Sequence, residues 1–381
     1  MNSIVSRRAL LGAAGVGVAF AAGHPALARS AASGTRSIPA DGFGHSPDIA
    51  FLARNENPYG PSPAALRAMA ETAGAGCYYT NDAEAKLTAM IAQSHGLTTD
   101  HVMIGNGSTE VLNCATMAFG RKGGILAPEL LFEPPLAYAE RKGVAVTRVP
   151  LTAGMGMDLA ALAAAVSPAV GLVHLCNPNN PTGLLVPGTE MRAFVAKVSP
   201  IAPVLVDEAY NELTDDPAAN SVVDRVKAGD RVIVTRTFSK LHGLAGLRVG
   251  YAIARPDLIA AMKDWSMSNG GNTSGLAAAM ASYDDKAFLA MSKAKIVEAR
   301  QMIEAAARAR GLETLPSAAN FVLVKVPDAE ALRKALADKG VVVRGPYGKW
   351  TGWSRVSCGR IEDVRRYTAV LPQALRAAAT A

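Results

Sequence analysis

A series of short apolar runs through the middle of the chain predicts the strands of one sheet. These runs lie at residues 101–107, 123–128, 144–150, 170–176, 203–210, 231–237 and 248–254. Stretches with Ala, Leu and Glu at helical spacing separate most of them. This alternation predicts an α/β fold with a mostly parallel sheet covered by helices.

The pattern changes after residue 275. Helix-forming residues dominate 275–312, and the apolar runs at 320–326, 341–344 and 353–359 then predict further strands, with helical stretches at 328–339 and 361–377. We therefore expect a large domain over 61–280 and a smaller α+β domain over 281–381. Residues 29–60 mix Ser, Gly, Pro and Ala in their first part and are expected to form an N-terminal arm.

The first 28 residues have the pattern of an export signal. Arg7 and Arg8 precede a Gly- and Ala-rich apolar run, and an Ala-Leu-Ala sequence ends at Ala28. The stretch "SRRALL" is similar to the twin-arginine signal, although the general export route stays an alternative. We expect cleavage after Ala28, a periplasmic location and no membrane span in the mature chain.

The charge distribution favours a small-molecule site. The chain of 381 residues has a formal net charge of +7, and its Lys and Arg residues are scattered. No basic stripe suggests a nucleic-acid partner. A slightly basic pocket for small anions fits this distribution better.

The four cysteines, Cys77, Cys114, Cys176 and Cys358, are far apart in sequence and form no CxxC pair. This spacing argues against a zinc site, and we predict no metal site. An exported protein can form disulfides, but buried free thiols are the interpretation we favour.

Polar clusters follow several predicted strands. They are "GNGSTE" (105–110), "CNPNNPTG" (176–183), "DEAY" (207–210) and "RTFSK" (236–240). Ligands of parallel sheets bind beyond the carboxyl ends of the strands. The clusters therefore predict one shared site.

The first cluster fits a helix N-terminus that binds phosphate, with Ser108 and Thr109 adding hydroxyl groups. A dinucleotide fingerprint would need a third glycine, and Glu110 stands in its place. An NAD-dependent dehydrogenase therefore remains only an alternative.

Two charged residues in the other clusters indicate chemistry. Asp207 ends a buried strand, where a carboxylate needs a cation or a hydrogen-bond donor. Lys240 follows another buried strand near Arg248, and such surroundings favour an uncharged, nucleophilic amine. Thr237, Ser239 and Arg248 could bind a phosphate beside it.

Together, "NPNNPTG", "DEAY" and a Ser-Lys pair with an arginine eight residues after the lysine resemble the fold-type I pyridoxal-phosphate (PLP) aminotransferases of class I/II. Within them, the sequence is most similar to the histidinol-phosphate aminotransferase group. The similarity extends from residues 53–63 to 354–363. It implies PLP as cofactor and a homodimer with shared active sites.

The resemblance also implies roles for individual residues. Lys240 would form a Schiff base with the cofactor and then move the substrate proton. Asp207 would pair with the pyridine nitrogen, which keeps the ring an electron sink. Asn180 and Tyr210 would hydrogen-bond the ring oxygen O3′.

The remaining cofactor contacts implied by the resemblance concern the ring face and the phosphate. Phe132 would stack on the ring, and Tyr79 would reach the phosphate from the partner subunit. The other phosphate-binding residues would be Ser108, Thr109, Thr237, Ser239 and Arg248.

Substrate contacts are implied in the same way. Arg355 would grip the α-carboxylate, for which a forked cation is suited. Asn180, Tyr59 and Arg344 are further substrate-binding candidates. Pro135 and the "YYTN" stretch at 78–81 depart from the family pattern near the substrate.

We therefore predict a PLP-dependent aminotransferase that moves an amino group between an L-amino acid and a 2-oxo acid by a ping-pong mechanism. The alternatives are another PLP reaction on the same fold, such as that of a decarboxylase, lyase or oxidase, and histidinol-phosphate aminotransferase proper. An export signal argues against the last, because histidine synthesis is intracellular. A non-catalytic binding protein is a further alternative.

Overall fold

The computed structural model describes residues 44–380. The predicted signal at 1–28 and the first part of the expected arm lie outside the described residues. Residues from Ser46 onward cluster into one compact unit.

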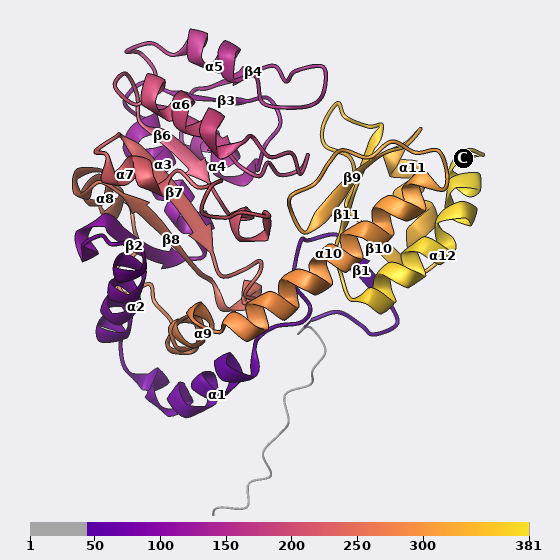
Figure 1. The fold of residues 1–381 in the computed structure, drawn as a ribbon, viewed down its shortest axis with the longest axis horizontal. Coiled ribbons are helices and arrows are strands. Elements are labelled where there is room, and N and C mark those ends of the chain that lie inside the picture. The colour runs from indigo at the N-terminus through magenta and orange to yellow at the C-terminus, as the bar shows by residue number, and fades with distance from the viewer. Residues whose placement is uncertain (1–43, 381) are drawn as a thin grey trace, which may run out of the picture. The chain divides into compact units, whose positions relative to one another are not determined.

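A seven-stranded sheet lies inside the left-hand part of this unit in Figure 1, in the order β2-β8-β7-β6-β5-β3-β4. Its strands are β2 (Val102–Asn106), β3 (Ile125–Pro128), β4 (Val146–Val149), β5 (Leu172–Cys176), β6 (Val204–Asp207), β7 (Val232–Thr237) and β8 (Val249–Ala254). Only β8 runs opposite to its neighbours β2 and β7. The predicted α/β fold with a mostly parallel sheet is confirmed.

Helices cover both faces of this sheet, because alternate strand residues pack into two separate cores. One core joins Leu172 and Leu205 to side chains of α3 (Ser108–Gly120), α4 (Pro134–Arg141) and α8 (Pro256–Lys263). The other joins Val173 and Val206 to helices on the opposite face. Those helices are α1 (Pro63–Thr72), α2 (Asn81–Ser94), α5 (Leu159–Ala165), α6 (Gly188–Val198), α7 (Val223–Lys227) and α9 (Thr273–Tyr283).

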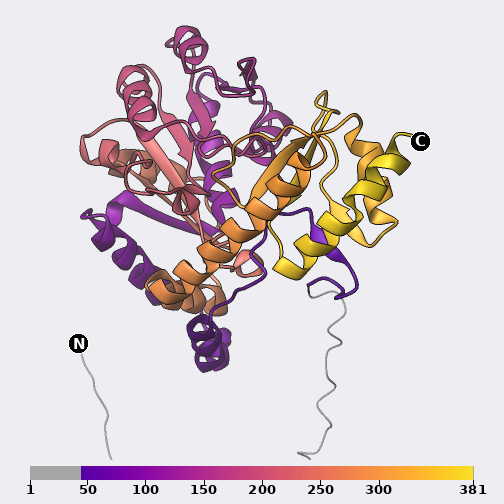
Figure 2. The same ribbon diagram turned by 45° about the vertical axis from the view of Figure 1, so that its right-hand side comes forward.

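The C-terminal part has its own core, built around two small sheets. Strands β9 (Phe321–Lys325) and β11 (Trp353–Ser357) are antiparallel, while β10 (Val341–Val343) pairs in parallel with β1 (Ala50–Leu52). Figures 1 and 2 show this N-terminal strand, in indigo, beside the orange and yellow C-terminal elements. The helices of this part are α10 (Lys286–Arg308), α11 (Ala329–Ala337) and α12 (Ile361–Ala378).

Local sequence explains where the helices start. Ser62 caps α1 by accepting a hydrogen bond from the backbone N–H of Ala65, and Pro63 stands in the first turn. The helical stretch expected over 275–312 is divided into α9 and α10. Asp285 separates them, because its side chain caps α10 by accepting from the N–H of Phe288.

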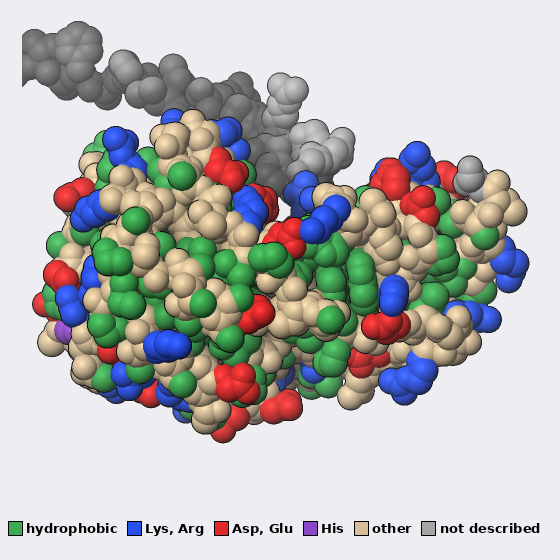
Figure 3. All heavy atoms as spheres, turned by 90° about the horizontal axis from the view of Figure 1, so that it is seen from above, with side chains coloured by type: hydrophobic (Ala, Val, Ile, Leu, Met, Phe, Trp, Pro, Cys, Tyr) green, Lys and Arg blue, Asp and Glu red, His purple; other side chains and the backbone are tan. Residues whose placement is uncertain are grey.

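Acidic and basic side chains are interspersed on the face that Figure 3 shows, with hydrophobic areas between them. Among the residues that the structure describes, no helix is both long enough and apolar enough to cross a membrane.

All four cysteines are free. Cys114, Cys176 and Cys358 are buried, as expected, but Cys77 is exposed. The expectation was wrong for Cys77 because this residue lies in a short 3-10 helix (Ala73–Cys77) in which no residue is buried.

Candidate active site

The carboxyl ends of β5, β6 and β7 and the start of α3 surround a cavity of about 280 Å³. The predicted polar clusters therefore meet at one place. The cavity is lined by every predicted cofactor residue except Tyr79. These are Ser108, Thr109, Phe132, Asn180, Asp207, Tyr210, Thr237, Ser239, Lys240 and Arg248.

One end of the cavity is suited to an anion. Helix α3 begins after Gly107, which has φ 72° and offers no side-chain cap, so the first backbone N–H groups are left for a ligand. The Arg248 guanidinium lies against Gly107, where a Cβ atom would come within 2.2 Å of Nη2. Arg248 is held there by donating from Nη1 to the carbonyl of Ala245 at 2.9 Å.

Asp207 lies at another side of the cavity and is only 2% exposed. Burial raises the pKa of its carboxyl to about 6, while a hydrogen bond from Thr235 and the positive charge of Lys240 act in the opposite direction. The Thr235 hydroxyl donates to Oδ1 at 3.0 Å. A cationic ligand nitrogen would favour the ionised carboxylate.

Lys240 points into the same space, and its Nζ donates to the carbonyl of Asn55 at 3.2 Å. Burial, followed by the charge of Arg355, lowers the pKa of Lys240 to about 8. Arg248, the cation expected to have this effect, contributes less than Arg355. The shift of Lys240 toward the uncharged amine is therefore caused mainly by burial and by a residue 115 positions away in the printed sequence.

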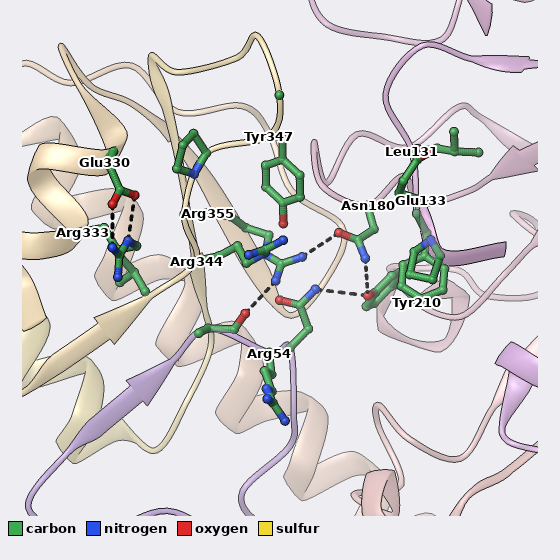
Figure 4. Close-up of a pocket in the computed structure, with 18 of the residues that line it drawn as sticks. Arg54, Leu131, Glu133, Asn180, Tyr210, Glu330, Arg333, Arg344, Tyr347 and Arg355 are labelled. Atoms are coloured by element: carbon green, nitrogen blue, oxygen red, sulfur yellow. Dashed lines mark hydrogen bonds and ion pairs between the residues drawn. The ribbon is translucent and has the colours of Figure 1, made fainter. Parts of the chain in front are cut away.

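A hydrogen-bond network links the cofactor side to the substrate side (Figure 4). The Tyr210 hydroxyl accepts from the side-chain amides of Asn55 at 3.2 Å and Asn180 at 3.3 Å. Arg355 donates from Nη1 to Asn180 Oδ1 at 2.7 Å. Burial raises the pKa of Tyr210, so the phenol stays protonated at neutral pH.

A second, wider cavity of about 880 Å³ adjoins the first and shares Arg54, Phe132, Asn180, Tyr210 and Lys240 with it. Arg355 lines it, is 6% exposed and keeps its Nε without a hydrogen-bond partner among the described residues. The predicted substrate residues Arg344, Arg355 and Asn180 all lie on this cavity. Its wall also includes the bidentate pair of Arg333 and Glu330, with distances of 2.8 and 2.6 Å.

Two predicted residues are not brought into these cavities. Tyr79 is 80% exposed. The Tyr59 hydroxyl accepts from the backbone N–H of Ile361 at 3.0 Å, so it fixes the start of α12 instead. Pro135, the noted departure, is buried in the first turn of α4.

Asn55 is a site residue that the sequence reasoning missed. Its backbone is left-handed, with φ 54°, and its side-chain oxygen accepts from Ser357 at 2.7 Å. Arg54, Glu330 and Arg333 also line the wide cavity without having been predicted. The available signals were the polar stretch "RNEN" directly after the apolar "IAFLA", and its place in the segment 53–63 where the family resemblance begins.

Comparisons with known proteins agree with this geometry. The chain is 37% identical over 341 residues to a histidinol-phosphate aminotransferase from Ralstonia nicotianae, covering 87% of this chain and 90% of the relative. It is 35% identical over 299 residues to one from Nitrosospira multiformis, covering 78% and 76%. A crystal structure of histidinol-phosphate aminotransferase from Sinorhizobium meliloti in complex with pyridoxal-5′-phosphate has a TM-score of 0.81 at 29% identity, covering 86% of this chain and 91% of that one.

The family model for aminotransferase class I and II matches residues 47–371, which include both cavities. The prediction of an aminotransferase of fold type I is thereby confirmed. The chain belongs to the class I and II aminotransferase family.

Proposed function

We propose that this chain is a PLP-dependent aminotransferase whose active site is the pair of cavities around Lys240, and that it moves an amino group between an L-amino acid and a 2-oxo acid. One observation carries the assignment of the site. A half-buried lysine with a lowered pKa lies in one small cavity with a buried acid and the start of a helix that has no side-chain cap.

The residues of the small cavity fit PLP in charge and position. Arg248, the hydroxyls of Ser108 and Thr109 and the free N–H groups of α3 would hold the phosphate. Asp207 would accept a hydrogen bond from the ring nitrogen. Lys240 would attach the cofactor through its amine. When bound, PLP supplies an electron-withdrawing ring that stabilises negative charge developing at the substrate Cα.

The protein would supply proton transfer and orientation. With its lowered pKa, Lys240 is poised to take the proton from the substrate Cα and return it. Asn180 and Tyr210 would hold the ring oxygen, since their side chains already contact each other on the cavity wall. Arg355, whose Nε has no hydrogen-bond partner among the described residues, would orient the substrate carboxylate.

An absorbance experiment tests the proposal. The purified protein should show a band near the visible edge that one or more L-amino acids bleach, and a 2-oxo acid should restore it. A Lys240→Ala variant should lack the original band. A protein without such a band, even with added PLP, would contradict the assignment, whereas release of CO₂ or ammonia without an acceptor would favour another PLP reaction.

The identity of the amino donor is a finer part of the proposal. Relatives carry the name histidinol-phosphate aminotransferase, but we propose export of this chain, on the basis of Arg7, Arg8 and the sequence ending at Ala28. A donor other than histidinol phosphate is then expected. Growth of a histidine auxotroph lacking its own transaminase, on this gene with the signal intact, would refute that expectation.

We also propose a homodimer with shared sites. The large hydrophobic side chains Leu66, Tyr78, Tyr79, Trp265 and Met267 are between 44% and 80% exposed. Exposed side chains of this size are candidates for a subunit contact. Tyr79 would then reach the phosphate end of the partner's cavity.

A further inference from the structure

We propose that Thr235 is a positioning residue of the active site, which orients the Asp207 carboxylate toward the ring nitrogen of the cofactor. The inference rests on the proposed function, because it assumes that Asp207 pairs with that nitrogen. Thr235 does not line the cavity itself but contacts Asp207, which does. It would therefore act through Asp207.

Strand register places Thr235 beside the acid. Asp207 on β6 has Cys176 of β5 and Thr235 of β7 as its Cα partners, so the three side chains form one row across adjacent parallel strands. The Thr235 hydroxyl donates to Asp207 Oδ1 at 3.0 Å, and the Cys176 thiol lies 3.9 Å from Oδ2. Thr235 thus contacts one oxygen of the Asp207 carboxylate, and Cys176 contacts the other.

The hydroxyl of Thr235 has no evident packing role. Thr235 is fully buried, at 0% exposure, and its strand neighbours Val234 and Ile233 are apolar. A valine at position 235 would fill nearly the same volume and would suit a buried strand equally well. The described hydrogen bond of this hydroxyl goes to Asp207, so orientation of the acid is the function that explains it.

Several groups around Asp207 determine how much this bond matters. Cys176, Tyr210 and Lys240 act on the carboxyl from nearby, and the backbone N–H of Ala209 donates to it. The charge of the adjacent Glu208 also raises the pKa of Asp207, although the Glu208 carboxylate itself bonds Ser221 and Arg236. Burial raises the pKa of Asp207, and the Thr235 bond is the first of the effects that oppose this rise. Loss of the hydroxyl should therefore raise the pKa further, and the ionised form should be lost at a higher pH as the solution is acidified.

The test compares Thr235→Val with the wild-type holoenzyme between pH 5 and 8, with PLP as the ligand. We expect the dissociation constant of PLP at pH 7.5 to rise about tenfold, because the lost hydrogen bond is one to a charged group and no longer orients the carboxylate toward the ring nitrogen. The acid-side midpoint of PLP binding should also move upward, by about one pH unit. Thr235→Ser, which keeps the hydroxyl, should restore both values.

Thr116→Val is the matched control. Thr116 is also at 0% exposure, but its hydroxyl donates to the carbonyl of Asn113 within α3. If Thr235→Val shifts neither the dissociation constant nor the midpoint beyond this control, the inference is wrong. If Thr235→Val does not fold, the dissociation constant and the midpoint are compared between Thr235→Ala, which lacks the hydroxyl, and Thr235→Ser, which keeps it. Equal values in these two variants would also show that the inference is wrong.

The outcome separates the inference from the proposed function. A wild-type protein that binds no PLP at any pH overturns both. A wild-type protein that binds PLP and transaminates, with an unchanged Thr235→Val variant, overturns only the role of Thr235.

Discussion

At the scale of single residues, the charge state of Lys240 connects catalysis to stability. Its surroundings favour the neutral amine, which is the form able to accept a proton. The same surroundings oppose the charged form in the folded protein, whereas the unfolded chain leaves the ammonium in water. A catalytic advantage is thus paired with a lower stability of the fold near neutral pH.

This pairing gives a prediction for the cofactor-free protein. The pKa of Lys240 is about 8 when folded, below the ordinary value of 10.5. Between these values the unfolded state binds more protons, so the free energy of unfolding should rise with pH. Urea unfolding at pH 7.5 and pH 9.5 should show a larger rise for the wild type than for Lys240→Met. Equal rises in the two proteins would refute the lowered pKa.

Some site residues could be predicted from sequence and others could not, for a physical reason. Asp207 and Lys240 follow apolar strands, where an unpaired charge is costly. This cost can be recognised from the local sequence, without knowledge of the rest of the fold. Asn55 gains its role only through contacts that sequence spacing does not reveal. Its backbone N–H and side chain bond Ser357, 302 positions away, and its carbonyl accepts from Lys240.

At the scale of elements, the start of α3 has no room for side chains at two glycines that lie against it. Gly107 combines a left-handed backbone with direct contact to Arg248, and Gly250 on β8 leaves room for the backbone of Ser108, where a Cβ atom would come within 2.1 Å. Missing side chains at two glycines thus let the helix N-terminus and its arginine approach each other.

We predict that Gly107→Ala weakens PLP binding at least about tenfold, because displacement of the guanidinium loses a charged hydrogen bond. The dissociation constant of PLP measures this effect. Gly246→Ala is the control in the neighbouring turn, since its Cβ would meet nothing within 4 Å. A Gly107→Ala protein that binds PLP as tightly as Gly246→Ala would contradict the anion-site assignment.

The strands of the large sheet could be predicted from the sequence, whereas the direction of β8 and the presence of β1 could not. Strands of the central sheet were found because both of their faces are buried, which gives continuous apolar runs. The reversed direction of β8 leaves no mark on such a run, because either orientation buries the same side chains. Strand β1 has three residues, too few for a periodic pattern, and its partner β10 lies at the other end of the chain.

At the scale of the whole molecule, the N-terminal segment belongs to the C-terminal core. Leu52 on β1 is at 0% exposure and packs in the same core as Phe321 and Val356. Substitution of Leu52 by Ala should lower the free energy of unfolding by about 2–5 kcal/mol. Ile201→Ala, at a site that is 46% exposed, should change it by less than about 0.5 kcal/mol. Urea unfolding measures both, and similar values would argue against β1 as a core strand.

The proposed homodimer makes a prediction of its own. Lys240→Ala and Tyr79→Ala proteins should each transaminate poorly, but hybrids formed by mixing them should contain one site with both residues intact. After subunit exchange, roughly a quarter of the wild-type sites should be restored. Transamination rates before and after mixing measure this. No recovery in a verified hybrid would place Tyr79 outside the partner's site.

The pairing of β1 with β10 also determines how much of the chain must be synthesised before the active site can form. Ala50 pairs with Val341, and Arg355 donates to the carbonyl of Ala53, so a ribosome must make the chain past residue 355 before the segment that carries Asn55 has its partners. The central sheet can form earlier, as N-terminal parts of a nascent chain generally do. The lysine pocket therefore stays incomplete until this part of the chain has been made, and stable capture of the cofactor becomes a late event in the making of the enzyme.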